Sequence, residues 1–342
     1  MELSVIIPVY NGEEYLEEAV KSVLNQPWRD LEVICVNDGS TDNSVSILES
    51  IAKADNRVHI VHQKNQGVAE ARNRGIDLAR GKYVAFLDQD DRYCRDVVTN
   101  ELIERIRKMP FDLVSFSYYH SNQKMSRGTL FPRQDAVVFD IFQRGGENYR
   151  HHSSYFYRTD FLRDKSIRVD RYRNEDERFR MQAIFQAEIA LYVSKPIFIY
   201  RNNRGSVTHQ KGAVSKVLLS CIEGYRELLE CTQHPAIMEY CKELIVRRLL
   251  GLLEVLAYES GSSEVMKEYL IKYKFEEYYN CVWKSKTDEN TWNEFMRDES
   301  AFIRRMRKRY RIMNCLRFVL HLPFMHNLYE MRKYSLKLNA DE

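Results

Sequence analysis

The sequence has little that would tie it to an oxidising compartment or to a membrane span. Its seven cysteines form no C-x-x-C pair and are odd in number, as is typical of free thiols in a reducing compartment. No apolar run reaches the length of a membrane-spanning helix, and no basic segment followed by an apolar one opens the chain. We therefore expect a cytoplasmic protein, peripheral at most to the cytoplasmic face of a membrane.

The chain also lacks a strong excess of either charge. Its 342 residues hold 52 Lys and Arg against 49 Asp and Glu, and a formal net charge of +3 does not predict a nucleic-acid partner. A hydrophobic fraction of 44% is enough for a full core, so a chain of this length predicts one large domain with an appendage.

Both common glycine-rich phosphate loops are missing. The first predicted turn, residues 8–13, has a single glycine, so the G-x-G-x-x-G of dinucleotide-binding enzymes is absent, and no G-x-x-x-x-G-K-[ST] occurs. These absences argue against a dehydrogenase and against a P-loop enzyme. If the ligand carries phosphates, a bound metal ion is the natural way to hold them.

A regular alternation of strand and helix patterns fills the first part of the chain. The predicted strands cover residues 3–9, 31–36, 58–61 and 83–87, and the predicted helices cover residues 13–24, 41–51 and 67–79. Short strand and helix units of this kind predict an α/β fold, with a Rossmann-like, mostly parallel sheet and flanking helices. Later strands are expected at residues 111–116, 189–193 and 197–200.

Acidic residues follow two of these strands. Asp88, Asp90 and Asp91 come directly after the apolar run 83–87, at the carboxyl end where open α/β sheets bind their ligands. Neighbouring carboxylates repel one another unless a cation lies between them, and Mg²⁺ or Mn²⁺ is the usual one. The alternative is an acidic turn in water. Asp38, after the second strand, can accept hydrogen bonds from a base or a ribose, or can be a turn and cap residue only.

Four segments, in order along the chain, carry a resemblance to a known family. They are SVIIPVYN at 4–11, VNDGSTD at 36–42, NQGVAEARNRG at 65–75 and FLDQDD at 86–91. The ordered set resembles the family 2 glycosyltransferases of the type that makes bacterial cell-surface polysaccharides, and the resemblance covers residues 1 to about 210. It implies the GT-A fold, which binds nucleotide sugars.

The resemblance also implies roles for single residues. It implies a nucleobase site framed by four residues, Pro8, Tyr10, Asn11 and Asp38. It further implies that Arg72 reaches the base from the third helix, and that Asp88 and Asp90 face the ribose and the metal ion. A solvated surface arginine is the alternative for Arg72.

A second acidic cluster opens the helix predicted to run to about residue 187. The segment Glu175-Asp176-x-x-Phe179 matches the family segment with the acceptor base, which implies that Asp176 is the base and that Glu175 orients it or the acceptor. A sugar hydroxyl must lose its proton as it attacks the anomeric carbon, and a positioned carboxylate contributes roughly 10²–10⁴-fold. The alternative is that these acids only favour the helix dipole.

The resemblance is uneven around the remaining site. The segment Arg201–His209 resembles the part that closes the donor site, which implies that its Arg, Ser and Thr bind the diphosphate and that His209 completes the metal shell. Ser153 and Tyr155 stand where many relatives have Trp and Lys, so the family's acceptor chemistry does not carry over. The adjacent pair His151-His152 diverges on a strand or a helix, and we do not predict that it binds a metal.

Helical patterns replace strand patterns after residue 210. We predict a catalytic GT-A domain over residues 1–210 and a helical region over residues 211–342. Residues 301–333 hold nine Lys and Arg against one acid, interleaved with apolar residues. Such a segment fits an interfacial helix on an anionic membrane surface, or a terminal helix packed on its own domain.

Together these patterns predict a metal-dependent, inverting glycosyltransferase that uses Mn²⁺ or Mg²⁺. The donor would be a nucleotide sugar, UDP-linked, and the acceptor a hydroxyl of a glycan or a lipid-linked molecule. Inversion is implied by the resemblance. One direct displacement needs a base and no protein nucleophile, which fits the single candidate base. Two alternatives stay open: a nucleotide- or glycan-binding protein that has lost its chemistry, and a nucleotidyltransferase, which would need a basic glycine-rich loop where this chain has an acidic one at 11–14.

Overall fold

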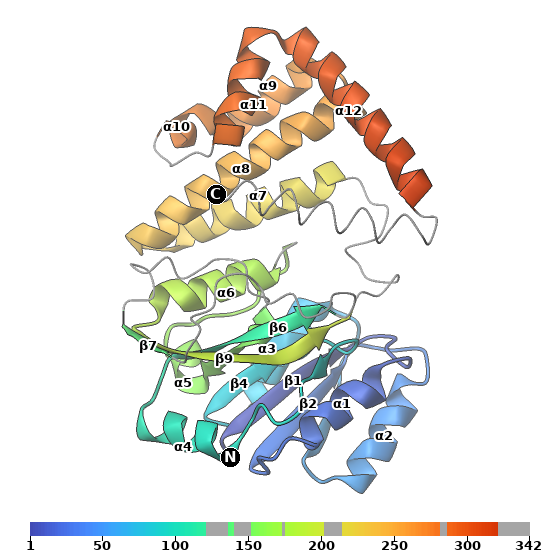
Figure 1. Cartoon of the computed structure of the whole chain (residues 1–342), viewed down its shortest axis with the longest axis vertical. Coiled ribbons are helices and arrows are strands. Elements are labelled where there is room, and N and C mark those ends of the chain that lie inside the picture. The colour runs from blue at the N-terminus through green and yellow to red at the C-terminus, as the bar shows by residue number, and fades with distance from the viewer. Residues whose placement is uncertain (121–135, 140–151, 173–174, 202–213, 281–285, 321–342) are drawn as a thin grey trace. The chain divides into compact units, whose positions relative to one another are not determined.

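The computed structural model describes residues 1–120, 136–139, 152–172, 175–201, 214–280 and 286–320 (Figure 1). The chain divides into two compact units. The first consists of Met1–Lys211 with His234–Ile237, and the second of Gly212–Gln233 with Met238–Glu342.

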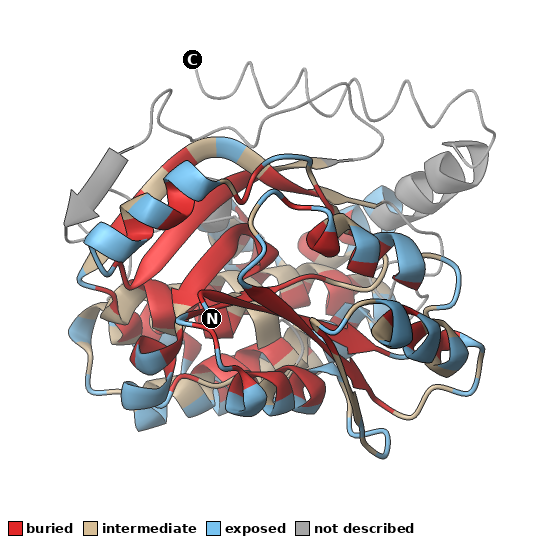
Figure 2. Ribbon diagram, turned by 90° about the horizontal axis from the view of Figure 1, so that it is seen from below, coloured by how far each residue is buried: buried red, intermediate tan, exposed pale blue. Residues whose placement is uncertain are grey.

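Four parallel strands form one half of the sheet in the first unit. They are β1 (Leu3–Val9), β2 (Leu31–Asn37), β3 (Val58–His62) and β4 (Tyr83–Phe86), in the order β3-β2-β1-β4. Every residue of β1, β2 and β4 is buried, as continuous apolar runs predict, and Figure 2 shows the central strands in the buried colour. Parallel pairing brings the carboxyl ends of these strands to one edge of the sheet.

Helices cover both faces of this half. α1 (Leu16–Leu24) and α2 (Ser44–Ala54) pack into the same core cluster as Leu3, Val5 and Ile7 of β1. α3 (Val68–Leu78) packs on the opposite face, in the cluster that contains Ile6. The alternation of side chains along β1 thus supplies both cores.

The other half of the sheet is mixed. It contains β5 (Arg92–Tyr93), β6 (Leu113–His120), β7 (Ala136–Phe139), β8 (Tyr155–Arg158) and β9 (Ile189–Tyr200). β8 lies antiparallel between β4 and β6, β9 runs parallel to β6, and β5 and β7 pair antiparallel with β9. The predicted α/β fold class is confirmed, but "mostly parallel" describes only the first four strands.

Two predicted strands are one. Residues 189–193 and 197–200 both belong to β9, whose pairing with β6 shifts register around Pro196. Proline donates no ladder hydrogen bond, so it breaks the sequence pattern without ending the strand. Three helices and a 3₁₀ turn connect the described strands of this half: α4 (Asn100–Lys108), η1 (His152–Ser154), α5 (Thr159–Asp164) and α6 (Glu175–Gln186).

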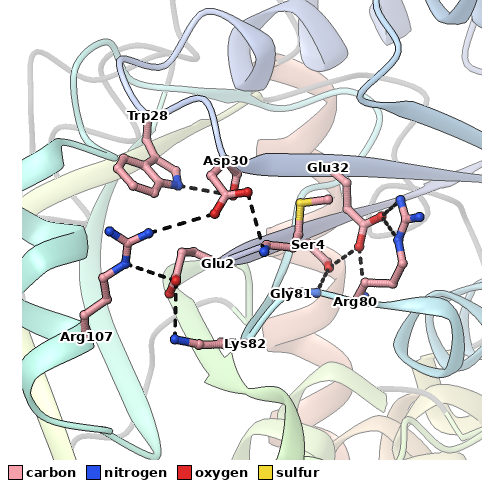
Figure 3. Close-up of polar contacts among 10 residues, drawn as sticks. Glu2, Ser4, Trp28, Asp30, Glu32, Arg80, Gly81, Lys82 and Arg107 are labelled. Carbon is pink, nitrogen blue, oxygen red and sulfur yellow. Dashed lines mark hydrogen bonds and ion pairs between the residues drawn. The ribbon is translucent and has the colours of Figure 1, made fainter.

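Polar residues tie together the amino ends of β1, β2 and the segment before β4 (Figure 3). The Glu32 carboxylate, almost fully buried, accepts hydrogen bonds from Ser4 Oγ at 2.7 Å and from Arg80 Nε and Nη2 at 2.9 and 2.6 Å. Ser4 Oγ in turn accepts from Gly81 N at 2.8 Å, in a space where any Cβ on Gly81 would lie 2.6 Å from Ser4 N. This network fixes the amino ends of the strands, at the end of the sheet opposite to Asp88, Asp90 and Asp91.

Replacing Glu32 with glutamine should destabilise the first unit by about 1–3 kcal/mol at neutral pH. Burial alone would raise the pKa of Glu32, but the hydrogen bonds from Arg80 and Ser4 outweigh it and lower the pKa. The stabilisation is therefore present above the pKa of the unfolded chain and is lost as the pH falls through the folded value. Urea unfolding of both proteins at about pH 7 and about pH 3 would test this, with exposed Glu49→Gln as control. A difference that did not shrink in acid would contradict the assignment.

The described part of the second unit is helical. It consists of α7 (Val214–Cys231), α8 (Pro235–Glu259, whose first three residues belong to the first unit), α9 (Ser263–Lys272), α10 (Phe275–Tyr279), α11 (Lys286–Arg297) and α12 (Glu299–Leu320). The ring centroid of Trp292 lies 4.6 Å from that of Phe275 and 6.0 Å from that of Phe295, which in turn lies 5.5 Å from Phe302. Within the described ranges, no helix is both long and apolar enough to cross a membrane.

The structure corrects part of the interfacial-helix hypothesis for α12. Phe302 and Met306, two of the apolar residues that would face lipid, are fully buried in the protein core. Arg304 and Lys308 lie one turn apart on the exposed side. The rest of the predicted apolar face, from residue 310 onward, lies outside the described side chains.

Candidate active site

Two loops at the carboxyl ends of β1 and β2 are hydrogen-bonded to each other. Asn11 has a φ of 48°, a left-handed conformation that asparagine adopts more readily than most residues. Its Oδ1 accepts a hydrogen bond from Thr41 N at 2.8 Å, and its own N donates to Ser40 Oγ at 3.1 Å. Pro8 is buried within β1, while Tyr10 is 48% exposed. Asn11 therefore holds the two loops together, and Tyr10 lies exposed beside them.

Gln89 joins the acidic loop, residues 88–91, to the loop that follows β1. Its amide accepts from Tyr10 N and donates to Tyr10 O, both at 2.9 Å. A Cβ on Gly12 would lie 2.3 Å from Gln89 Oε1, so glycine leaves the room that the amide occupies. Gln89 therefore fixes Asp88 and Asp90 relative to the predicted nucleobase site.

Asp38 is buried and accepts three hydrogen bonds from the loop before α3. Its Oδ1 accepts from Gln63 Nε2 and Gln66 N, and its Oδ2 from Gly67 N, all at 2.8 Å. Gly67 has a φ of 93°. A carboxylate has about four acceptor positions, so one remains for a ligand beside this loop-holding role.

The three acids after β4 occupy different environments. Asp88 and Asp90 are partly exposed, whereas Asp91 is 2% exposed and its Oδ1 accepts from Arg201 N, at the end of β9, at 2.7 Å. Burial, and then the charges of Asp88 and Asp90, raise the pKa of Asp91 to about 9. Asp91 therefore holds β9 to the acidic loop.

Arg201 is the described residue of the predicted donor-closing segment. Its Nε donates to Asp90 O at 2.8 Å, its Nη2 bonds Glu18 Oε2 at 2.6 Å, and its guanidinium lies 4.3 Å from the centroid of the Tyr15 ring. These contacts give Arg201 a scaffolding position against α1. His209 lies outside the described residues.

Arg72 lies between the two acidic clusters. Its side chain is only 5% exposed, Nη2 lies 2.9 Å from Asp88 Oδ1, and Nη1 lies 2.9 Å from Glu175 Oε1. Burial lowers the pKa of Arg72, but the charges of Asp88 and Glu175 outweigh it and raise the pKa above its ordinary value. The solvated alternative for Arg72 is therefore wrong, and both terminal nitrogens bind carboxylates.

An aromatic cluster positions α6 and its acids. The Phe179 ring, one turn after Asp176, meets the Phe86 ring of β4 edge-on at 5.4 Å and the Tyr157 ring of β8 at 5.1 Å. Phe179 is almost fully buried. The apolar residue of the E-D-x-x-F segment thus docks the helix, and the acids before it project at the carboxyl edge of the sheet.

His152 is a residue that sequence reasoning missed. Its side chain is 2% exposed; Nε2 lies 3.9 Å from Asp88 Oδ1, and Nδ1 lies 3.7 Å from Asp176 Oδ2. No periodic signal precedes it, since it follows a long segment without a helix or strand pattern. The one available signal was its place beside Ser153 and Tyr155, in the part of the family resemblance that concerns the acceptor.

The structure therefore gathers Asp88, Arg72, Glu175 and Asp176 around His152. In the described ranges no three His, Cys, Asp or Glu side chains form a group that could hold a metal ion. Mg²⁺ in nucleotide enzymes, however, is often held by one or two carboxylates and the substrate's phosphates. The buried Asp91 Oδ2 has no hydrogen-bond partner in the described part of the chain, and burial and the charges of Asp88 and Asp90 raise the pKa of Asp91 in spite of the nearby Arg201. Asp88 and Asp90 thus fit a divalent ion.

Known proteins are similar to this chain in sequence and in fold. Residues 4–185 match the family model described as glycosyl transferase family 2. The uncharacterized glycosyltransferase EpsJ of Bacillus subtilis (strain 168) is 32% identical over 259 residues, which cover 70% of this chain and 72% of EpsJ. Glycosyltransferase GlyG of Streptococcus pneumoniae serotype 4 is 29% identical over 60% of this chain and 72% of its own. S. aureus TarS 1–349, in a crystal structure with UDP-GlcNAc, has a TM-score of 0.66 at 20% identity, covering 91% of this chain and 92% of that one.

The sheet, its flanking helices and the likeness to TarS define a GT-A-type fold. The match over residues 4–185 and the similarity to EpsJ show more: the chain belongs to glycosyl transferase family 2 and is a transferase enzyme. The predicted family, fold class and enzyme class are confirmed. Membership of this family favours a glycosyltransferase over the nucleotidyltransferase and the non-catalytic binding protein.

Proposed function

We propose that this enzyme transfers a sugar from a UDP-linked donor to a hydroxyl of a glycan or lipid-linked acceptor, in a metal-dependent, inverting reaction. The observation that carries the proposal is the arrangement around Arg72, which bridges Asp88 on the donor side and Glu175 on α6 at 2.9 Å each. A single displacement needs donor-side acids and an acceptor-side base close together. The TarS complexes with UDP and UDP-GlcNAc support the choice of nucleotide.

Asp176 is the better base of the two acids on α6. Glu175 is 20% exposed, and its Oε1 is held in an ion pair with Arg72 at 2.9 Å. Asp176 is 34% exposed, and its side chain is therefore more accessible to an acceptor hydroxyl. Asp176 takes the proton of the attacking hydroxyl, while Glu175 holds Arg72 and the start of α6 in place.

The nucleotide would be bound by the loops that follow β1 and β2 and by the acidic loop that follows β4. The exposed ring of Tyr10 can stack on the uracil, and the remaining acceptor position of Asp38 can bind a base N–H or a ribose hydroxyl. Asp88 and Asp90 would hold the divalent cation, which when bound neutralises charge on the departing diphosphate. His209 remains a proposed further ligand.

A donor screen tests the proposal directly. Purified enzyme would be incubated with a panel of nucleotide sugars, with Mn²⁺ or with EDTA, and release of the free nucleotide measured. We expect slow hydrolysis of UDP-sugars above other nucleotide sugars, and only with the metal. Equal hydrolysis with EDTA would overturn metal dependence, and a preference for another nucleotide would overturn the donor.

Replacing Asp90 with asparagine should remove the effect of the cation on UDP binding. The substitution removes an anionic oxygen ligand, so the gain in UDP affinity on adding Mn²⁺ should fall by about tenfold or more, which is at least about 1.4 kcal/mol. Calorimetry with Mn²⁺ and with EDTA measures it, and exposed Asp96→Asn is the control for loss of a nearby charge. Unchanged metal-dependent affinity would remove Asp90 from the metal site.

We also propose that exposed basic residues of α12 bring the enzyme to an anionic membrane surface, where a lipid-linked acceptor would lie. Arg305 and Arg309 pair with Glu294 and Glu254 of the same unit, and Arg307 donates to Ser260 O at 3.4 Å. Arg304 and Lys308, exposed one turn apart, are therefore the residues that we change. Each basic residue near such a surface contributes about 1 kcal/mol, so Arg304→Glu with Lys308→Glu should weaken binding at least about tenfold.

Sedimentation with phosphatidylserine vesicles measures this binding, and neutral phosphatidylcholine vesicles are the control. Charge reversal is a better test than truncation, because removing residues from 301 onward would also remove Phe302 and Met306 from the core. Equal sedimentation of both proteins would contradict the role of this pair.

A further inference from the structure

His152 reaches the site because of a strand direction that the sequence pattern does not reveal. β8 runs antiparallel to β4, with Ala85 opposite Phe156 and Tyr83 opposite Arg158. The residues just before β8 therefore lie beside the residues just after β4. Because η1 ends where β8 begins, the antiparallel pairing brings His152 next to Asp88.

His152 is held in place through both its ring and its backbone. Its centroid lies 5.7 Å from that of Phe86, and Tyr157 Oη donates a hydrogen bond to the His152 carbonyl oxygen at 3.0 Å. η1 also packs against α6, the helix that carries Asp176. At 2% exposure the ring has little room to move, so the position of each ring nitrogen is set by packing.

The two ring nitrogens face different partners. Nδ1 lies 3.7 Å from Asp176 Oδ2, whereas Nε2 lies 3.9 Å from Asp88 Oδ1 and 3.4 Å from the buried hydroxyl of Ser153. If Ser153 donates to Nε2, the ring proton is on Nδ1 and points to Asp176. A contact of 3.7 Å is longer than a hydrogen bond, but such contacts in catalytic sites often tighten when the substrate binds.

We propose that His152 is a positioning residue for the base: its Nδ1–H orients the Asp176 carboxylate and fixes its distance from the donor-side acid Asp88. This inference rests on the proposed function, because it takes Asp176 as the base. A carboxylate on the first turn of a helix can rotate about its side-chain torsions, and a misplacement of about 1 Å costs up to 10²-fold in rate. The buried ring limits that rotation.

Three substitutions separate the orienting hydrogen bond from simple packing. His152→Phe keeps a ring against Phe86 and has no N–H. His152→Asn places an amide N–H near the position of Nδ1, whereas the longer side chain of His152→Gln places it near Nε2. We expect kcat of sugar transfer to fall between about tenfold and a hundredfold in His152→Phe and His152→Gln, and by much less in His152→Asn.

The test measures kcat and KM of transfer, with UDP calorimetry and thermal melting as checks on folding. Donor KM and UDP affinity should change less than about threefold, because the donor contacts remain. In the Asp176→Asn background, His152→Phe should lower kcat no further, since the group it orients is already lost. His59→Phe, in the edge strand β3, controls for loss of a histidine.

The outcomes are distinguishable from failure of the proposed function. If Asp176→Asn itself keeps normal turnover, Asp176 is not the base, and the proposed function falls with this inference. If Asp176→Asn is slow while His152→Phe turns over normally, His152 has no role and only this inference falls. A further loss in the double variant, or equal losses in His152→Asn and His152→Gln, would also overturn it.

Discussion

Replacing Asp176 with asparagine should lower kcat for sugar transfer by about 10² or more while leaving donor binding intact. The amide matches the carboxylate in size but cannot take a proton, so the acceptor hydroxyl would have to attack without a base. The helix itself should stay docked, because Phe179 of α6 packs on Phe86. Steady-state kinetics with the best donor from the screen, together with UDP calorimetry, give both quantities.

Glu177→Gln is the matched control for this variant. Glu177 belongs to the same acidic first turn of α6, so its loss removes an equal charge from the helix start. We expect kcat to stay within about twofold of wild type, because the dipole effect of one acid is only about 0.3–1 kcal/mol on stability. Similar rate losses in both variants would mean that the acids act on the helix and not on the acceptor.

The sequence was sufficient to predict the half of the fold in which short apolar strands alternate with helices. β1, β2, β3 and β4 are short, apolar and separated by helices, and their parallel pairing follows from that alternation. For the same reason, the acids after β4 could be placed at the carboxyl edge from sequence alone. Local patterns determine these features, so local patterns reveal them.

The other half depends on contacts between distant segments. Nothing in residues 155–158 states that β8 inserts antiparallel between β4 and β6, and Pro196 divides the pattern of β9 in two. The position of His152 follows from the β8 insertion, so it could not be predicted. Arg72 shows the same limit, since a polar stretch of helix gives no sign that one of its arginines is buried between acids of two other elements.

These distant contacts make the site a single charged unit. The guanidinium of Arg72 touches Asp88, which follows β4, and Glu175, which opens α6. His152 faces Asp88 and Asp176 across the same gap. A change at either acid cluster therefore alters the electrostatic environment of the other, and donor and acceptor functions should not respond independently to substitutions here.

Replacing Arg72 with methionine should accordingly have the largest effect on stability, a loss of about 3–5 kcal/mol, with loss of transfer. Methionine fills a similar volume, but it leaves Asp88 and Glu175 without their shared cation and close to Asp176, in a site where water compensates only in part. Arg72→Lys should retain part of the stability, because an ammonium is one point charge and cannot bond both acids in the fork geometry of a guanidinium.

Urea unfolding and transfer assays of Arg72→Met, Arg72→Lys and Arg74→Met would decide the matter. Arg74 is exposed on the same helix two residues away, so its loss removes the same charge without leaving two partly buried acids unpaired. It should change stability by less than about 0.5 kcal/mol. If Arg72→Met also fell within that range, the ion pairs would contribute nothing net. If it unfolds, Glu175→Gln in the same chain should restore part of the stability, since removing the second unpaired charge relieves the repulsion that the first substitution created.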